Sequence, residues 1–285
     1  MSVRIIVDSA SDMRAATAAE QGLVFASLKT ILAGTEYRDG IDITPDTFYD
    51  KLKANKELAR TSQVNVGEFQ EFFKAAVDEG DEVLVITISS GLSGTYQSAK
   101  IAAADFQGKV FVVDSLSATA GEQVLIAHAV KLRDEGKSAA EIFAELDVLR
   151  HKARLLLRVE TLEYLKRGGR VSKTAAFVGG MLHFMPVLTL NWEGKLETVG
   201  KARGVKMSHK MVNDAIVAAG GIDFSYPVVI TYAGDLADGT VDAYLKDSKE
   251  IYGDNVDKLT VGQLGCVIGT HTGPGAIVVS FVPKA

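Results

Sequence analysis

The sequence is poor in cysteine: Cys266 is the single cysteine among 285 residues. One cysteine excludes an internal disulfide and a metal site built from several cysteines, so a reducing compartment is expected. No apolar run approaches the roughly 20 residues that span a bilayer. The first residues also lack the basic and apolar segments of a secretion signal. We therefore expect a soluble, cytoplasmic protein.

Motifs for nucleotides and metals are also missing. No G-x-G-x-x-G occurs, and the Gly-Lys-Ser at 136–138 has Lys131 where a phosphate loop needs its earlier glycine. The five histidines lie far apart, and none forms a local pair with the spacing of metal ligands. A net charge of −5 argues against non-specific nucleic-acid binding, which needs a basic surface. We expect no metal, no cofactor and no nucleic-acid partner.

Positive charge is concentrated in one stretch of the chain. Between Arg150 and Lys173, lysines and arginines far outnumber the acids, Glu160 and Glu163. A solvated helical face is the simplest explanation of such a run. The alternative is a surface that receives a phosphate or an acidic partner, and the sequence alone leaves both open.

The hydrophobic content of 47% is enough to fill a substantial core, and the length allows one large domain or two ordinary ones. In the first half, β-branched runs at 4–8, 82–88 and 109–114 predict strands, and helical spacing occurs at 66–79 and 95–104. Continuous apolar runs are typical of a parallel sheet that is covered on both faces. Their alternation with helices predicts βαβ units.

Three further segments complete the first half. Alternating polarity and an Asp-Gly pair at 24–40 predict a strand or hairpin excursion. Two helices are expected, at 119–135 and 139–150. Gly136 fits the left-handed stop of the first helix, and the S-x-x-E sequence at 138–141 forms a capping box for the second.

The second half mixes strands and helices, and "NWEGKLE" at 191–197 predicts a hairpin turn, which a purely parallel sheet would not contain. We therefore expect an α/β protein of two domains. An N-terminal α/β/α domain with a parallel sheet covers 1–154, and a C-terminal α+β domain with a mixed sheet covers 155–285. The segments predicted in the second domain are strands at 186–190, 195–199, 228–232, 256–261 and 276–282, and helices at 205–219 and 236–252.

The stretch "SSGLSGTYQSA" at 89–99 follows a predicted buried strand. It is one residue short of the G-x-S-x-G nucleophile elbow, because Thr95 stands where the second glycine is needed. A hydrolase using Ser93 and His271 is therefore one possibility. Another is a site where Ser93 and the amides at Gly94 donate to an anion, such as a carboxylate. An ordinary helix cap is the third.

Other short segments carry candidate side chains. Thr61 lies in "ARTSQ", which alone fits a helix cap, and His271 lies among small residues in "IGTHTGPG", expected to be a loop before the last strand. Arg170 follows two glycines in "LEYLKRGGRVS", and Arg203 lies in "KARG". Arginines beside a reacting phosphate stabilise its charge.

Asp-Ser pairs close two of the predicted strands. Asp8 and Asp114 are each followed by serine, and parallel strands would bring them to the edge where ligands bind in open α/β sheets. Both aspartates are expected to be structural, bonded to amides or hydroxyls at the strand ends.

The order and spacing of these motifs, together with "VDSASD" at 7–12, resemble the DegV family of fatty-acid-binding proteins, the binding subunits of bacterial fatty acid kinase. The resemblance covers nearly the whole chain. It implies one long-chain fatty acid buried between two domains, with its carboxylate held by Thr61, Ser93, Gly94 and His271. It also implies that a separate kinase subunit binds ATP and converts the carboxylate to an acyl phosphate.

In that family, residues corresponding to Arg170 and Arg203 are associated with phosphoryl transfer and kinase docking. We accordingly expect a monomer that is not an enzyme on its own and that contacts membranes only transiently. A stand-alone lipid carrier or sensor is the main alternative to kinase presentation. The hydrolase is the less favoured alternative.

Two departures from the family pattern are present. Val64-Asn65 follows "TSQ" where proline is common, and Met185 precedes Pro186 where lysine is frequent. The second departure affects the surface or lining of the second domain. The preferred acyl chain is not determined by the sequence, since side chains such as those of 177, 182 and 184 fit a tunnel lining or a core equally well.

Overall fold

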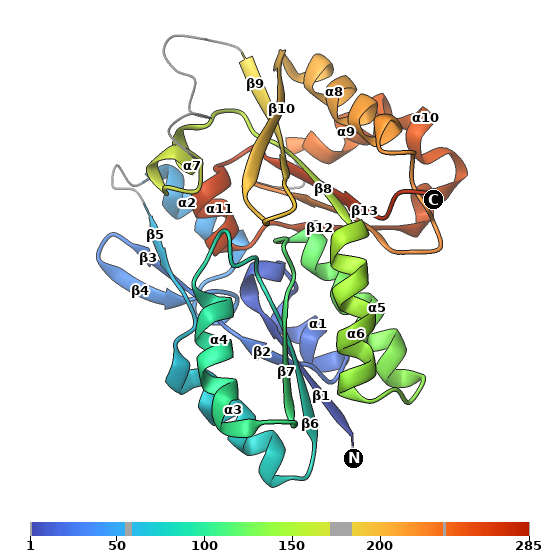
Figure 1. Cartoon of the computed structure of the whole chain (residues 1–285). Coiled ribbons are helices and arrows are strands. Elements are labelled where there is room, and N and C mark those ends of the chain that lie inside the picture. The colour runs from blue at the N-terminus through green and yellow to red at the C-terminus, as the bar shows by residue number, and fades with distance from the viewer. Residues whose placement is uncertain (1, 55–58, 172–183, 236–237, 285) are drawn as a thin grey trace.

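The computed structural model describes residues 2–54, 59–171, 184–235 and 238–284. Figure 1 shows two sheets with separate sets of helices, one sheet near each end of the molecule. The predicted combination of a parallel sheet and a mixed sheet is confirmed. The domain boundary between residues 154 and 155 stays a prediction.

The first sheet is parallel throughout, with strand order β2-β1-β6-β7. Helices α3 and α4 cover one face and α5 and α6 the other (Figure 1). Apolar side chains are buried on both faces, which is why the runs in the sequence are continuous. The strands are β1 (Val3–Asp8), β2 (Val24–Ala26), β6 (Glu82–Thr87) and β7 (Val110–Asp114). The helices are α3 (Val66–Asp78), α4 (Thr95–Ala103), α5 (Ala120–Asp134) and α6 (Ala139–Lys152).

Within the excursion expected at 24–40, β3 (Lys29–Leu32) and β4 (Thr35–Arg38) form a small antiparallel sheet with β5 (Arg60–Ser62), in the order β4-β3-β5, whereas β2 joins the parallel sheet. The turn of the small sheet lies at Ala33-Gly34, where both residues have positive φ. The Asp-Gly pair at 39–40 forms a separate turn after β4, in which the Ile41 amide donates to the carbonyl oxygen of Arg38 at 3.2 Å. Between β4 and β5 lies α2 (Pro45–Ala54).

The second sheet has the order β10-β9-β8-β13-β11-β12, and β11 with β12 forms its parallel pair. The hairpin predicted at 191–197 connects β9 to β10. The strands are β8 (Arg154–Arg158), β9 (Phe184–Leu190), β10 (Leu196–Arg203), β11 (Val228–Tyr232), β12 (Leu259–Gln263) and β13 (Ile277–Phe281). The helices that follow these strands are α8 (Val205–Ala218), α9 (Thr240–Asp247) and α10 (Lys249–Tyr252).

Three details of this half differ from the sequence-based expectation. Strand β8 was not predicted, and β12 begins at Leu259 because 253–258 form a 3-10 helix. The single helix expected at 236–252 is interrupted at Ser248, which separates α9 from α10. Of that segment, 236–237 lie outside the described residues.

Helix ends follow the signals in the sequence where those signals are local. The capping box at 138–141 is present, with Ser138 accepting from the Glu141 amide. Gly136 has a φ of +84°, as its stop position predicts. The remaining short helices are the 3-10 turns at Ser9–Ser11 and Ala104–Phe106, and α1 (Ala15–Glu20), α7 (Glu163–Arg167) and α11 (Cys266–Thr272).

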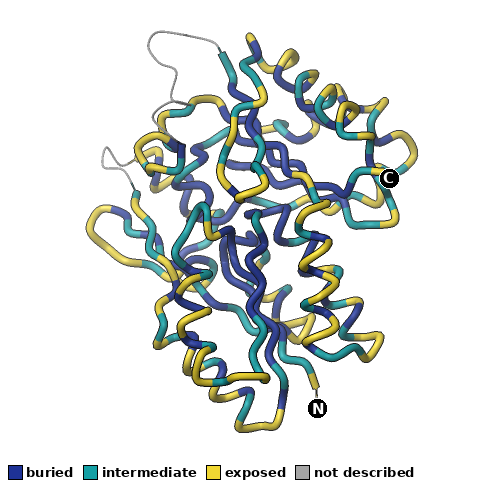
Figure 2. The backbone as a smooth tube through the Cα atoms, viewed as in Figure 1, coloured by how far each residue is buried: buried dark blue, intermediate teal, exposed yellow. Residues whose placement is uncertain are grey.

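Side chains of the second sheet alternate between two cores. Leu155, Leu157 and Val278 face the first sheet and join its core, whereas Leu156 and Val279 pack beneath the helices of the second half. Figure 2 shows the buried backbone concentrated in the strands of both sheets and where they meet. Among the described residues, no helix has the length and apolar character needed to cross a membrane.

Candidate functional site

A cavity of about 320 Å³ lies between the two sheets. This volume falls within the ~300–1,000 Å³ of typical small-molecule sites. Its walls are mostly apolar and come from both halves of the chain, including Ile88, Ala118, Leu155, Leu157, Leu190 and Val278. The cavity therefore accepts an apolar ligand that contacts both sheets.

Polar side chains gather at one part of this lining. Thr61, Ser93, Gly94 and His271 all line the cavity, so the structure brings together the four candidates for carboxylate binding. Thr61 is the middle residue of β5, and its Oγ1 lies 2.9 Å from Nε2 of His271. The two residues are 210 positions apart in the chain.

His271 lies in the last turn of α11, although the sequence predicted a loop there. Burial lowers the pKa of His271 to about 4, and the nearby positive charge of Arg170 makes a smaller contribution in the same direction. The imidazole is therefore neutral at pH 7, with one ring nitrogen as donor and the other as acceptor. Its Nδ1 is buried and has no hydrogen-bond partner among the described residues.

Carboxylates from the first half of the chain hold α11 in place. Asp12 accepts from the amide of Gly265 at 2.8 Å, and Asp39 accepts from those of Cys266 and Val267 at 3.0 and 3.2 Å. These bonds satisfy the free amides at the helix N-terminus. They fix the helix that carries His271 against the first half of the chain.

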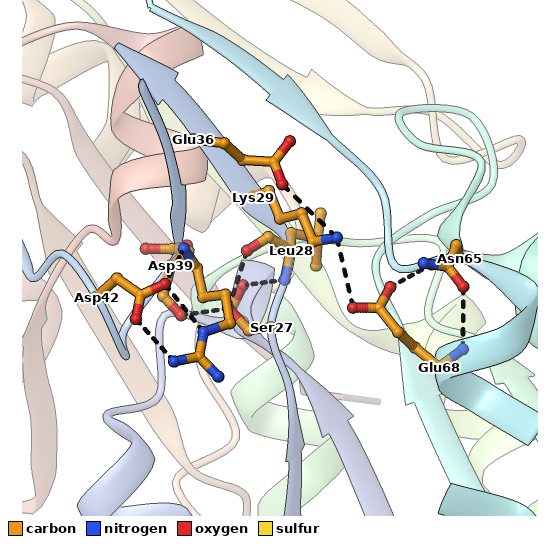
Figure 3. A network of polar contacts seen from close by, with 10 residues as sticks. Ser27, Leu28, Lys29, Glu36, Asp39, Asp42, Asn65 and Glu68 are labelled. Atoms are coloured by element: carbon orange, nitrogen blue, oxygen red, sulfur yellow. Dashed lines mark hydrogen bonds and ion pairs between the residues drawn. The ribbon is translucent and has the colours of Figure 1, made fainter. Parts of the chain in front are cut away.

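The strand that carries Thr61 is anchored through its neighbours (Figure 3). Ser27 Oγ donates to the carbonyl oxygen of Asp39 at 2.7 Å, at the start of the small sheet. Lys29 of β3 lies 3.6 Å from Glu68, which completes the capping box of α3 with Asn65. The small sheet is thereby tied to a helix of the first sheet, which orients Thr61.

Ser93 and Gly94 precede α4. Ser93 Oγ lies 2.9 Å from Thr95 Oγ1 and accepts from the amide of Thr95, the first residue of α4, at 3.3 Å. A Cβ on Gly94 would stand 2.1 Å from Oε1 of Gln63, so Gln63 occupies the space beside this glycine. Gln63 also donates to the Gly94 carbonyl oxygen and to Ser98 Oγ.

The first glycine of this loop contacts the β9–β10 hairpin. A Cβ on Gly91 would lie 2.7 Å from the carbonyl oxygen of Gly194, and Ser89 Oγ donates to that oxygen at 2.8 Å. Leu190 and Leu196, on either side of the hairpin turn, both line the cavity. The loop and the hairpin together close this side of the cavity.

The aspartates at the strand ends have structural roles, as expected. Asp8 accepts from the amides of Ala10 and Ile88 at 2.9 and 2.8 Å. Asp114 accepts from those of Ser90 and Leu116 at 3.0 and 3.1 Å. Both carboxylates thus fix the loops around the cavity and do not line it.

The two candidate arginines occupy different places. Arg170 lines the cavity and donates to the carbonyl oxygens of Leu92 and Gly168. Burial lowers the pKa of Arg170. Arg203 is exposed at the end of β10 and does not line this cavity. The structure therefore brings only Arg170 to the polar part of the site.

A second cavity of about 840 Å³ adjoins the first, and Thr61, Arg170 and His271 line both. Sequence reasoning missed Gln63, which lines the first cavity, and Arg60, which lines the second. Both lie in "ARTSQ" at 59–63, and their closeness to Thr61 in the sequence was the signal that could have found them. Neither had been given a role.

Three further expectations concern the remaining residues. Positions 177 and 182 lie outside the described residues, and Phe184 begins β9 without lining the cavity. Met185 contacts a buried arginine, with its Sδ 2.8 Å from Nη2 of Arg158. Over the described parts of the chain, no cluster of three or more His, Cys, Asp or Glu side chains is arranged for a metal ion.

Comparisons with known proteins agree with this fold. A DegV domain-containing protein of Clostridium perfringens is 33% identical over 98% of this chain and 96% of its own length. A structure titled as fatty acid binding of a DegV family protein from Thermus thermophilus has a TM-score of 0.87 and 35% identity, covering 99% and 100% of the two chains.

A DegV family protein from Eubacterium eligens, loaded with heptadecanoic acid, has a TM-score of 0.84 and 27% identity, covering 99% of this chain and 100% of its own. The sequence model of the family described as "Uncharacterised protein, DegV family" matches residues 2–284. The chain therefore belongs to the DegV family.

Proposed function

We propose that the protein binds one long-chain fatty acid in the cavity between the sheets and presents its carboxylate to an ATP-dependent kinase subunit. The observation that carries this proposal is the position of Thr61 and His271. They stand between an apolar cavity and a polar one, at 2.9 Å from each other. An acyl chain fits the first, and the second leaves its head group accessible to chemistry.

The apolar walls supply most of the affinity. A chain of ~15 methylenes gains about 0.8 kcal/mol for each methylene on full burial. Part of this gain is lost to the entropy of association. The relatives from Thermus thermophilus and Eubacterium eligens, both above 25% identity, are described with fatty acids, which supports the same ligand class here.

The carboxylate head group of the fatty acid needs only hydrogen-bond donors for its oxygens. A carboxylate left unpaired in a buried place costs several kcal/mol, on the order of the desolvation of an ionised group. The hydroxyls of Thr61 and Ser93, the amide at Gly94 and the neutral His271 are the proposed donors. Hydrogen bonds from these donors favour the charged form of the carboxylate, and because none of the four is a cation, its oxygen remains nucleophilic.

In the kinase step, a carboxylate oxygen forms a bond to the γ-phosphorus of ATP held by the partner. The bond from that phosphorus to its bridging oxygen breaks, and the electron pair leaves with ADP. This chain contributes position and charge: Arg170 counters the negative charge beside the carboxylate. Arg203, at the exposed end of β10, is proposed to contact the kinase.

A carrier or sensor that works without a kinase has the same cavity and remains the second candidate. An assay that combines this protein with a kinase subunit, ATP and fatty acid distinguishes the carrier from the kinase-presenting protein. Arg170→Ala should leave binding intact and reduce acyl phosphate formation. Absence of acyl phosphate with wild-type protein and several bacterial kinase subunits would favour the carrier.

The monomeric state, the cytoplasmic location and transient membrane contact also stay predictions.

The hydrolase alternative has little support in the geometry. His271 Nε2 contacts Thr61, whereas Ser93 Oγ contacts Thr95. Among the described residues, no carboxylate hydrogen-bonds to His271 to orient it as a base. Ester turnover abolished by Ser93→Ala would revive this alternative.

Native mass spectrometry tests the binding proposal most directly. Protein purified without denaturant should carry a mass increment equal to one fatty acid. After delipidation it should take up palmitate or oleate with a stoichiometry of one. A ligand-free protein that takes up neither would refute the proposal.

A further inference from the structure

The second cavity differs in chemistry from the first. It is formed by the turn of the small sheet, β5 and α7, and it meets the apolar cavity at Thr61, Arg170 and His271. Besides Arg170, its lining includes Arg60 and Arg167. No acidic side chain is among the described residues that line it. The cavity therefore suits an anion.

The three arginines differ in the hydrogen bonds and ion pairs that their side chains already form. Arg167 forms an ion pair with Glu163 one turn earlier in α7. Arg170 is half-buried and donates to two backbone carbonyl oxygens. The Arg60 side chain is exposed and forms no hydrogen bond or ion pair with another described residue. Of the three, Arg60 has its guanidinium available for a ligand.

Arg60 is also placed next to the head-group position. It directly precedes Thr61 in β5, and the register pairs it with Ile31, whose strand ends at the turn that lines the same cavity. A fatty acid in the apolar cavity points its carboxylate at Thr61 and His271. Any atom added to that carboxylate must extend away from the acyl chain, towards the second cavity.

We propose that the second cavity holds the phosphoryl group of an acyl phosphate, and that Arg60 contacts that group. The inference rests on the proposed function, which it extends from a carboxylate to its phosphorylated product. Neutral donors suffice for a carboxylate with one charge. A phosphoryl group carries more negative charge and three terminal oxygens, which an arginine fork matches in a bidentate contact.

The competing explanation is that Arg60 is a solvated surface residue with no ligand. The two explanations differ in how Arg60 affects two ligands with the same acyl chain. A solvated arginine would influence palmitate and a phosphorylated analogue equally. An arginine that contacts phosphate would affect the analogue alone.

The probes are palmitate and 2-oxoheptadecylphosphonate, in which a methylene replaces the ester oxygen of palmitoyl phosphate. Affinity is measured by calorimetry with delipidated protein. For Arg60→Gln we expect about a 10- to 100-fold loss of affinity for the phosphonate, the range of a charge-assisted hydrogen bond. Palmitate affinity should change less than about twofold, because its head group ends at Thr61 and His271, where the two cavities meet.

Arg38→Gln is the matched control. Arg38 lies on β4 of the same small sheet, is exposed and pairs with Asp42, and it does not line the second cavity. It should leave both affinities unchanged. Arg60→Lys should restore part of the phosphonate affinity, since the charge returns without the planar fork.

Each outcome decides one question. Equal losses for both ligands, or no loss for either, would overturn the role of Arg60. Failure of wild-type protein to bind palmitate would instead refute the fatty-acid site itself. Since Arg60 is exposed, Arg60→Gln should fold normally, and an unchanged Tm checks this.

Discussion

At the scale of single residues, the donors proposed for the head group are neutral, and burial keeps the one ionisable donor among them, His271, in that state. The low pKa of His271, about 4, means that its imidazole remains uncharged throughout the physiological range. A charged imidazole would hold a carboxylate more tightly and reduce the nucleophilicity of its oxygen. The buried position of His271 thus suits presentation of a reactant.

His271 also makes stability depend on pH. Its folded pKa of about 4 lies below the ordinary value of 6.5, so between these values the unfolded chain binds a proton that the folded chain does not. The free energy of unfolding should therefore fall as pH drops from 6.5 towards 4, by up to roughly 3 kcal/mol.

Urea unfolding across that pH range measures this slope. His271→Gln should flatten it, whereas His151→Gln, at an exposed position of α6, should not. An identical slope in wild type and His271→Gln would mean that other groups cause the acid sensitivity.

Glu122 gives the opposite pH dependence. It is 0% exposed, and neither carboxyl oxygen has a partner among the described residues. Burial, followed by the charges of Asp8 and Asp12, raises its pKa well above the ordinary value. The folded state then keeps a proton that the unfolded state has released, so this contribution to stability is lost as pH rises.

Glu122→Gln should therefore unfold at higher temperature than wild type at pH 8 and at nearly the same temperature at pH 4. Calorimetry at the two pH values measures the difference. Glu71→Gln, at an exposed position of α3, is the control. A stabilisation that is equal at both pH values would contradict the proposed titration.

At the scale of elements, the β9–β10 hairpin closes the cavity through a short contact with the loop at 89–94. Gly91→Ala would place a methyl group 2.7 Å from the carbonyl oxygen of Gly194. Because the clash is with backbone atoms of the hairpin, which cannot rotate away as a side chain can, the hairpin must move. Fatty acid dissociation should become faster by about tenfold or more, and fluorescence displacement measures it.

Ser89→Ala is the milder variant of the same contact. It removes the hydrogen bond to Gly194 at a cost of about 1 kcal/mol without adding a clash. Ser90→Ala, whose side chain is exposed, should change nothing. If Gly91→Ala releases fatty acid at the wild-type rate, the hairpin does not control access.

Elements with local sequence signals could be predicted, and those held by distant residues could not. Strands β1, β6 and β7 and helices α3 to α6 follow from continuous apolar runs and local caps. Helix α11 has the sequence "CVIGTHT", rich in residues with low helix propensity, and depends on Asp12 and Asp39 for its caps. No local pattern reveals such a helix.

The site shows the same division. Thr61, Ser93 and His271 were named from short motifs and a family resemblance. That Thr61 bonds to His271 depends on how β5 and α11 pack, which spacing along the chain does not encode. Arg60 and Gln63 were overlooked because an arginine or glutamine in a loop carries no distinctive pattern.

At the scale of the whole molecule, the cavity is a gap between two sheets that a ligand would fill. A ligand at a hundred times its Kd adds about 2.7 kcal/mol to stability. For a chain of this size that corresponds to roughly 4–5 °C in Tm. Delipidation should lower the Tm by this amount.

Differential scanning calorimetry before and after delipidation measures the shift. Added palmitate should restore the original Tm, whereas butyrate, which buries too little apolar surface, should not. A Tm that is the same with and without ligand would indicate that the cavity closes when empty.

Side chains along β8 alternate between the two cores, and this alternation limits which sequence changes the strand can accept. Leu155 and Leu157 face the cavity, and Leu156 between them faces the other core. Substitutions at positions 155 and 157 can therefore change the shape of the proposed lipid site while the packing under α8 stays intact. A shift of one residue in register would exchange the two sets. Single substitutions in β8 can thus alter the cavity alone, whereas an insertion or deletion within the strand would alter the cavity and the second core together.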